Sequence, residues 1–180
     1  MNDLNLDLAN LYEDYETIGY HGHVIEVIND ILKTKKFTQS NGNWCYAGKG
    51  VYFFDNDLSV TERWCERARK YKEYGIVKVD IKAYNIIDLD NNVHYNKIEK
   101  FARLINERYK SLSNKKELDT KLLFDYIYNY IKYDLVKFTT KIKGKGARII
   151  KTHIFRNSVI LCVRNHRCIS NVRKVKEVKR

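Results

Sequence analysis

The sequence predicts a protein of the α+β class. Apolar residues follow a helical spacing in some segments and a strand-like alternation in others, without regular alternation of the two kinds of element. A regular βαβ order would predict a parallel α/β sheet, so the mixed order, with strand patterns gathered toward the C-terminal end, favours α+β. With 180 residues and no repeat or linker-like tract, the chain is expected to form one domain over residues 1–180.

The first part of the chain is expected to contain two helices, a strand and a loop. Residues 3–15 carry leucines and tyrosines at helical spacing, and residues 17–22 are typical of a short strand that ends at a glycine. Residues 24–32 form a broad apolar helical face, followed by lysines that complement the negative end of the helix dipole. Residues 40–50 contain three glycines and predict a loop.

A strand and a capped helix are expected next. Residues 51–54 form a short apolar strand. Ser59 and Glu62 have the spacing of a capping box, which predicts a helix from about 60 to 73. Gly75 then lies where a glycine commonly ends a helix.

The second half combines strands with long helices. Residues 95–112 and 117–136 have helical apolar spacing, so residues 91–140 are expected to be a helical insertion. A glycine-rich turn at 143–146 precedes the last strands, which form a hairpin. The strand patterns lie at 76–81, 85–89, 148–155 and 159–163.

The composition excludes several classes of protein. No apolar run approaches the ~20 residues that cross a bilayer. The first sixteen residues contain five acids and no Lys or Arg, which is the wrong charge for a signal peptide. We therefore expect a soluble protein of the cytoplasm. At 44% hydrophobic residues, the chain has enough apolar side chains to build a core.

Histidines and cysteines do not form a recognisable metal motif. No CxxC pair occurs, so neither a disulfide framework nor a structural zinc site is expected, and no metal is predicted. Buried small side chains are the better interpretation of Cys65 and Cys162. Two sets of residues have the side chains that bind zinc but lack the paired spacing of a zinc site: His21, His23, Cys45 and Cys65, and separately Cys162, His166 and Cys168.

Positive charge is unevenly distributed along the chain. The net charge is +12, yet seven of the 22 acids precede Lys33, the first basic residue, so the remainder carries 34 basic residues against 15 acids. A field of this sign attracts nucleic acid, nucleotides or an acidic protein. Basic clusters lie at 141–148 and 164–180.

Two short motifs carry the functional argument. Residues 20–23 read YHGH at the end of a predicted strand, just before a helix, and residues 48–54 read GKGVYFF, a glycine-bracketed turn that leads into an aromatic strand. Each motif alone is commonly structural. Their order is more specific, because a polar loop separates them and a capped helix with Trp64 follows.

This order resembles the ADP-ribosyltransferase superfamily of the diphtheria-toxin and poly(ADP-ribose)-polymerase kind. Its members show His-Gly on the first core strand, a G-x-G-[VI]-Y-F strand, and then a helix with an aromatic residue. The resemblance covers residues 16–90 and, more loosely, 147–170. It implies an α+β core split into two sheets, to which residues 91–140 add helices.

The resemblance implies that NAD is a co-substrate. Cleavage of its glycosidic bond releases nicotinamide and creates an oxocarbenium-like ribose. The family implies that the main chain of Gly22 binds the carboxamide, which a glycine permits because no side chain blocks the approach. It implies for His21 a hydrogen bond to a ribose hydroxyl, and for Tyr52 a ring that packs on the nicotinamide.

Other residues are expected to complete the NAD site. Trp64 is the candidate for the other side of the nicotinamide ring, with Tyr46 as an alternative. Ser59 is the candidate that holds the carboxamide, although its spacing from the aromatic strand is one residue shorter than the family's. His23 takes a position where many relatives have Thr or Ser, so a polar contact is expected there. Candidates for binding the pyrophosphate are Lys49 and Arg67.

The third catalytic position departs from the commonest pattern. Relatives often place a glutamate on a late strand, and the resemblance puts Ile160 at that position. No acid lies between Asp134 and Glu177. The resemblance therefore gives the set His21, Tyr52 and Ile160. In the family, such a set accompanies transfer of a single unit or inactivity.

The leading hypothesis is an NAD-dependent mono-ADP-ribosyltransferase whose acceptor is a nucleic acid rather than a protein. Such a chain suits an intracellular toxin, a defence effector or a phage-encoded modifier, for which an antitoxin or inhibitor protein is a candidate partner. Two alternatives remain open. One is an NAD-dependent RNA 2′-phosphotransferase-like enzyme, and the other is a catalytically degenerate nucleic-acid-binding module.

Overall fold

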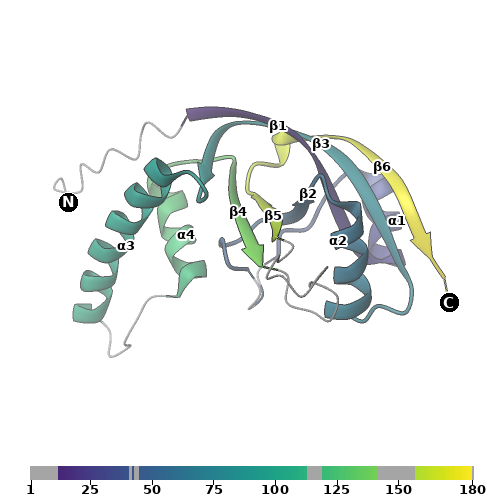
Figure 1. The fold of residues 1–180 in the computed structure, drawn as a ribbon, viewed down its shortest axis with the longest axis horizontal. Coiled ribbons are helices and arrows are strands. Elements are labelled where there is room, and N and C mark those ends of the chain that lie inside the picture. The colour runs from purple at the N-terminus through teal and green to yellow at the C-terminus, as the bar shows by residue number, and fades with distance from the viewer. Residues whose placement is uncertain (1–11, 41, 43–44, 113–118, 142–156, 180) are drawn as a thin grey trace, which may run out of the picture.

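The computed structural model describes residues 12–40, 42, 45–112, 119–141 and 157–179. The strands are β1 (Tyr12–Val24), β2 (Val51–Asp55), β3 (Tyr74–Asp88), β4 (Leu135–Lys141), β5 (Asn157–Val163) and β6 (Ile169–Val178). The helices are α1 (Ile25–Thr34), α2 (Leu58–Arg63), the π-helix η1 (Trp64–Ala68), α3 (Asn92–Leu112), α4 (Thr120–Tyr130) and the 3₁₀-helix η2 (His166–Cys168). The mixture confirms the α+β class (Figure 1).

All six strands belong to one sheet, in the order β1-β2-β5-β4-β3-β6. Because β1 also pairs with β3 along nearly its whole length, the first five strands form a closed ring. Two of its joints are short: β1 meets β2 at only two residue pairs, and β3 meets β4 at three. The expected division into two sheets is therefore not what the strand pairing shows, since both joints are hydrogen-bonded.

Helices cover the sheet at two separate places. Figure 1 shows α3 and α4 side by side at one end of the molecule, and α1 and α2 at the other end. Helix α1 contributes Ile28 and Ile31 to a core with Phe53 and Val77 of the strands. Helices α3 and α4 share a second core with β4 and β5, which contains Phe101, Phe124, Val136 and Cys162. None of the helices in the described ranges is long and apolar enough to span a membrane.

Several expected elements are corrected by the structure. The helix expected at 117–136 ends at Tyr130, and 135–141 is the strand β4, so 91–140 is not helical throughout. The two strands expected at 76–81 and 85–89 are one strand, β3. Of the helix expected at 3–15, residues 12–15 belong to β1, while 3–11 lie outside the described residues.

The helix after β2 also differs from its prediction. Its N-cap is Asp57, whose carboxylate accepts the N–H of Val60 at 3.0 Å, rather than Ser59. The α-helix ends at Arg63 and continues as a π-helix to Ala68, instead of reaching 73. Gly75 is not a helix cap but lies within β3, where a Cβ atom would come within 2.9 Å of Ile28.

Candidate functional site

Strands β1 and β2 pair only briefly and then separate. Their pairs are Gly19 with Asp55 and Tyr20 with Phe54. The carbonyl of Ile18 accepts a hydrogen bond from Asn56 on this side, so by strand alternation Gly22 also directs its N–H and C=O toward β2. Among the described residues, the ladder between β1 and β2 does not extend to Gly22. We call the space between residues 21–23 and 51–53 the β1–β2 seam.

The imidazole of His21 bridges this seam. Its Nδ1 lies 2.9 Å from the carbonyl oxygen of Tyr52. A carbonyl oxygen only accepts hydrogen bonds, so Nδ1 carries the proton and Nε2 is left as an acceptor. Burial lowers the pKa of His21 to about 4, which keeps the ring neutral near pH 7. The ring packs against Phe37 and Phe53, each with its centroid 5.6 Å away.

Position 22 requires a glycine because the segment after β2 packs closely where a side chain would stand. A Cβ atom there would lie 2.3 Å from the sulfur of Cys65 and 3.1 Å from a methyl carbon of Thr61. The helical segment after β2 thus presses directly on β1. The main-chain groups of Gly22 point sideways, along the sheet, and are not covered by this contact.

The ring of Tyr52 is fixed by its hydroxyl. The hydroxyl donates to the carbonyl of Gly48 at 2.8 Å and accepts from the N–H of Ala47 at 3.1 Å. Burial is the main cause that raises the pKa of Tyr52 above its ordinary value, so the phenol stays protonated. Tyr52 is therefore held at both ends, its carbonyl by His21 and its hydroxyl by the turn at residues 47–48.

Ile160 lies on β5, the next strand of the sheet. It stands opposite Phe54 of β2 on one side and Phe138 of β4 on the other. The side chains of directly opposite residues share a face of the sheet, so Ile160 is on the same face as Phe54 and Tyr52. The three positions implied by the resemblance, which are His21, Tyr52 and Ile160, thus lie on three neighbouring strands. The side chain of His21 lies on the other face, beside Phe53, and meets Tyr52 only at its main-chain carbonyl.

His23 and Trp64 belong to an aromatic group beside the seam. The ring of His23 lies 6.2 Å from that of His21 and 5.5 Å from that of Tyr71. Burial, and then the charge of Arg69, lower the pKa of His23. The indole of Trp64 contacts Phe54 and Tyr71, each at 6.2 Å, and Arg69 stacks on it at 5.4 Å.

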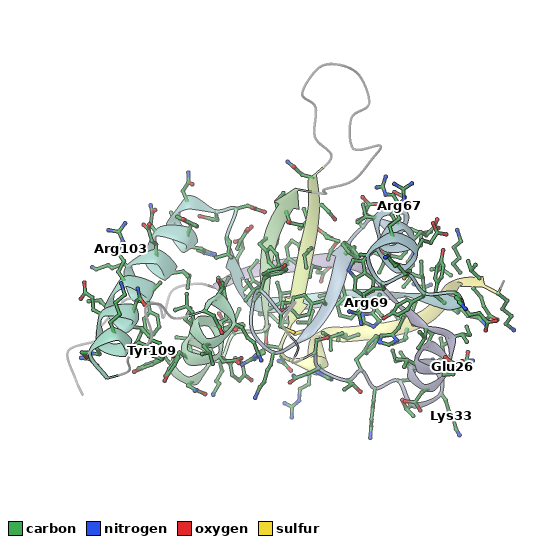
Figure 2. All side chains as sticks on the ribbon, turned by 90° about the horizontal axis from the view of Figure 1, so that it is seen from below. Glu26, Lys33, Arg67, Arg69, Arg103 and Tyr109 are labelled. Atoms are coloured by element: carbon green, nitrogen blue, oxygen red, sulfur yellow. The ribbon has the colours of Figure 1, made fainter. Side chains whose placement is uncertain are left out.

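The remaining candidates lie farther from the seam or turn outward. Ser59 is exposed at the start of α2, and its hydroxyl donates to Asp57 at 2.9 Å. Tyr46 is 55% exposed, and the side chain of Lys49 is also exposed. Figure 2 shows Arg67 and Arg69 on and just after η1, on the same side of the molecule as Glu26 and Lys33 of α1, while Arg103 and Tyr109 mark α3 at the opposite end.

The residues that hold the turn at the Tyr52 hydroxyl are not indicated by the sequence. Asp125 of α4 and Arg164, directly after β5, form a 2.7 Å ion pair against this turn. They are 39 residues apart in the chain, and no local pattern indicates such a contact. Of the basic cluster predicted at 141–148, Lys141 ends β4, and residues 142–148 lie outside the described residues.

No metal centre is formed by the described residues, in which no group of three or more His, Cys, Asp or Glu side chains could hold an ion. All four cysteines are free and buried. Two surface hollows have volumes of about 560 Å³ and 210 Å³. They lie beside β6 and between α3 and α4, so neither is at the seam.

Comparison with known proteins assigns the chain to no family. No family model matches it, and neither does any curated protein or solved structure.

Proposed function

We propose that the chain is an NAD-dependent mono-ADP-ribosyltransferase whose acceptor is a nucleic acid. The proposal rests on one observation, the β1–β2 seam. There, the main chain of Gly22 and that of Tyr52 face each other without ladder pairing, and a neutral His21 lies between the strands. These are the same residues that the sequence motifs select.

Each group of the seam suits one part of NAD. A carboxamide contains both a donor and an acceptor, and the N–H and C=O of Gly22, which point toward β2, provide the complementary pair. The unprotonated Nε2 of His21 accepts a hydrogen bond from a ribose hydroxyl. The aromatic face of Tyr52, held by its two hydroxyl contacts, provides an apolar surface for the nicotinamide ring.

The proposed reaction exchanges one bond at the ribose. The bond from C1′ to the nicotinamide nitrogen breaks, and its electron pair leaves with neutral nicotinamide. A nucleophilic atom of the acceptor bonds to C1′ and loses its proton. Ile160 has no group that can accept that proton, so the proton passes to solvent or to the acceptor itself. In the family that the sequence resembles, this pattern accompanies transfer of a single unit or inactivity, and the proposal takes the first.

A nucleic-acid acceptor is favoured by charge. The net charge of +12 is far more than one pyrophosphate needs. Arg69, Lys70 and Lys72 are exposed just after η1, and Tyr71 between them contacts His23 beside the seam. Basic side chains with interleaved aromatic rings can bind phosphates and stack bases. We therefore place the proposed activity in an intracellular toxin, defence effector or phage-encoded modifier.

Incubation with labelled NAD and separate pools of DNA, RNA and protein tests the proposal. We expect label in a nucleic-acid pool, with release of nicotinamide, and its loss in His21→Ala and Tyr52→Ala. The matched control is His166→Ala, which removes an exposed histidine. Labelling that survives both site variants contradicts the site. Reaction only with 2′-phosphorylated RNA indicates the phosphotransferase instead, and absence of NAD binding by the wild type rules out both enzymes.

A further inference from the structure

The turn that holds the hydroxyl of Tyr52 is itself clamped from two distant parts of the chain. Arg164 Nη1 donates to the carbonyl of Lys49 and also to Oδ1 of Asp125, the latter at 2.7 Å. The same Oδ1 accepts the N–H of Lys49 at 3.1 Å. Both main-chain polar groups of Lys49 are thus bound by one ion pair, which we call the Asp125–Arg164 clamp.

The clamp is buried and held in place by its neighbours. The side chain of Arg164 is 7% exposed and that of Asp125 is 22% exposed. Tyr128, one helical turn after Asp125 on α4, stacks on the Arg164 guanidinium at 4.3 Å. Because taking two charges out of water costs free energy, such a pair is weak evidence for stability. What this geometry does provide is a fixed position for the turn.

The turn packs closely against the clamp at Gly48. Gly48 has φ +79°, a value that favours glycine. A Cβ atom on Gly48 would lie 3.0 Å from Oδ1 of Asp125 and 3.3 Å from Nη1 of Arg164. The carbonyl that receives the Tyr52 hydroxyl therefore belongs to a residue packed directly on the clamp.

We propose that Asp125 and Arg164 are positioning residues. They hold the ring of Tyr52 in the position in which it packs on the nicotinamide of NAD. This inference rests on the proposed function, in which Tyr52 packs on the nicotinamide. The link runs from Asp125 of α4 to the N–H of Lys49, through the Gly48–Lys49 peptide bond, and from the carbonyl of Gly48 to the Tyr52 hydroxyl. The α3–α4 region is thereby part of the site, although the sequence presents it as an insertion.

Replacement of Asp125 tests the clamp. Asp125→Ala leaves the N–H of Lys49 without its acceptor and releases Arg164, so the turn and the Tyr52 ring can shift. Since misplacement by about 1 Å can cost about 100-fold, we expect NAD-dependent nicotinamide release to fall by about 10- to 100-fold, with weaker NAD binding. Asp125→Asn keeps Oδ1 as an acceptor and should restore most of the loss.

A matched control and a double variant separate positioning from general damage. Glu99→Gln makes the same carboxylate-to-amide change in an exposed helical ion pair, with Arg103 of α3, and should leave the activity unchanged. In a Tyr52→Phe background, which lacks the hydroxyl, Asp125→Ala should add no more than about 2-fold, because the two residues act through one contact.

Fluorine NMR of 3-fluorotyrosine-labelled protein reads the Tyr52 ring without NAD. Tyr52→Phe assigns its resonance, which should shift in Asp125→Ala and not in Glu99→Gln. A folded Asp125→Ala with an unmoved Tyr52 resonance overturns the inference, even if the wild type is an active transferase. A shifted resonance with unchanged NAD affinity overturns it too. If the wild type does not bind NAD, the proposed function fails, and this inference fails with it even where the resonance shifts.

If Asp125→Ala does not fold, Arg164→Lys provides an alternative test of the clamp. It keeps the positive charge but loses the planar group that reaches both partners. An intermediate shift of the Tyr52 resonance and an intermediate NAD affinity are expected. Wild-type values for both quantities count against the clamp.

Discussion

The charge state of His21 is set by burial rather than by a charged partner. Desolvation is the largest cause that lowers its pKa to about 4, and the contact with the Tyr52 carbonyl opposes the shift only in part. The neighbouring His23 lowers it further. A neutral imidazole with a defined tautomer is what a hydrogen-bond acceptor in the seam requires.

This lowered pKa predicts an acid-sensitive fold. The unfolded chain binds a proton at His21 below about pH 6.5, whereas the native protein binds it only below about pH 4. Stability is therefore complete above pH 6.5 and falls as the pH drops through this window, by about 3 kcal/mol from His21 alone. Urea unfolding between pH 7.5 and pH 4.5 should show a smaller loss in His21→Asn. The exposed control His166→Asn should follow the wild type, and an equal loss in His21→Asn contradicts the assignment.

Gly22 gives a second test at the scale of one residue. Gly22→Ala puts a Cβ atom 2.3 Å from the Cys65 sulfur, so we expect a loss of about 1–3 kcal/mol in the free energy of unfolding. Cys65→Ala removes that sulfur. The double variant should be more stable than Gly22→Ala alone, as measured by urea unfolding. Strictly additive losses would show that the two residues do not clash.

At the scale of elements, periodicity in the sequence predicts some segments and hides others. The apolar face of α1 and the aromatic strand β2 have clear local patterns, and both are present. Strand β4 follows α4 after only four residues, so its apolar residues read as a continuation of the helix. Strand β6 has no buried residue and several basic ones, so its sequence resembles a solvated tail, although the strand pairs with β3.

The candidate site also contains residues that local motifs indicate and residues that they do not. His21, Gly22 and Tyr52 lie in short motifs whose order is visible in the sequence, and in the structure His21 and Gly22 lie beside the main chain of Tyr52. The clamp could not be predicted, because Asp125 and Arg164 meet only after α4 and β5 have packed against the same turn. Contacts of this kind depend on the tertiary fold and leave no local pattern.

The carboxylate of Asp134 links its own segment to β3 and to the segment before η2, so its removal should destabilise the fold. One carboxylate oxygen accepts the N–H groups of Tyr84 and Asn85 at 3.0 and 3.1 Å, and the other accepts Nδ2 of Asn165 at 2.8 Å. Asp134→Ala leaves these donors without their partner and should cost about 1–3 kcal/mol of unfolding free energy. Asp30→Ala, an exposed change on α1, is the control. Equal stability of the two variants in urea would argue against this junction.

At the scale of the whole molecule, the positive charge is not equally available everywhere. The basic residues of β6 have acidic neighbours: Arg173 lies 3.4 Å from Asp80, and Lys174 lies 2.6 Å from Glu177. Exposed pairs of this kind contribute little to stability. Each nevertheless places a carboxylate where a phosphate would otherwise bind, so β6 is a weaker site for a polyanion than its composition suggests.

A comparison of two double variants with the same change in net charge tests this view. Lys70 and Lys72 are exposed beside Tyr71 and form no ion pair with another described residue. Lys174 and Lys176, by contrast, are paired with Glu177 and Glu62. If cations near the seam bind the acceptor, Lys70→Gln/Lys72→Gln should weaken binding of a single-stranded oligonucleotide. It should also flatten the dependence of log K on log salt by about 0.7 for each lysine.

Lys174→Gln/Lys176→Gln should change that slope much less, because fewer counterions are released from cations that already have a carboxylate partner. Fluorescence anisotropy at several salt concentrations measures both slopes. If the two variants have equal slopes, the molecule attracts nucleic acid through its overall charge alone, and the surface beside the seam has no special part in binding the acceptor.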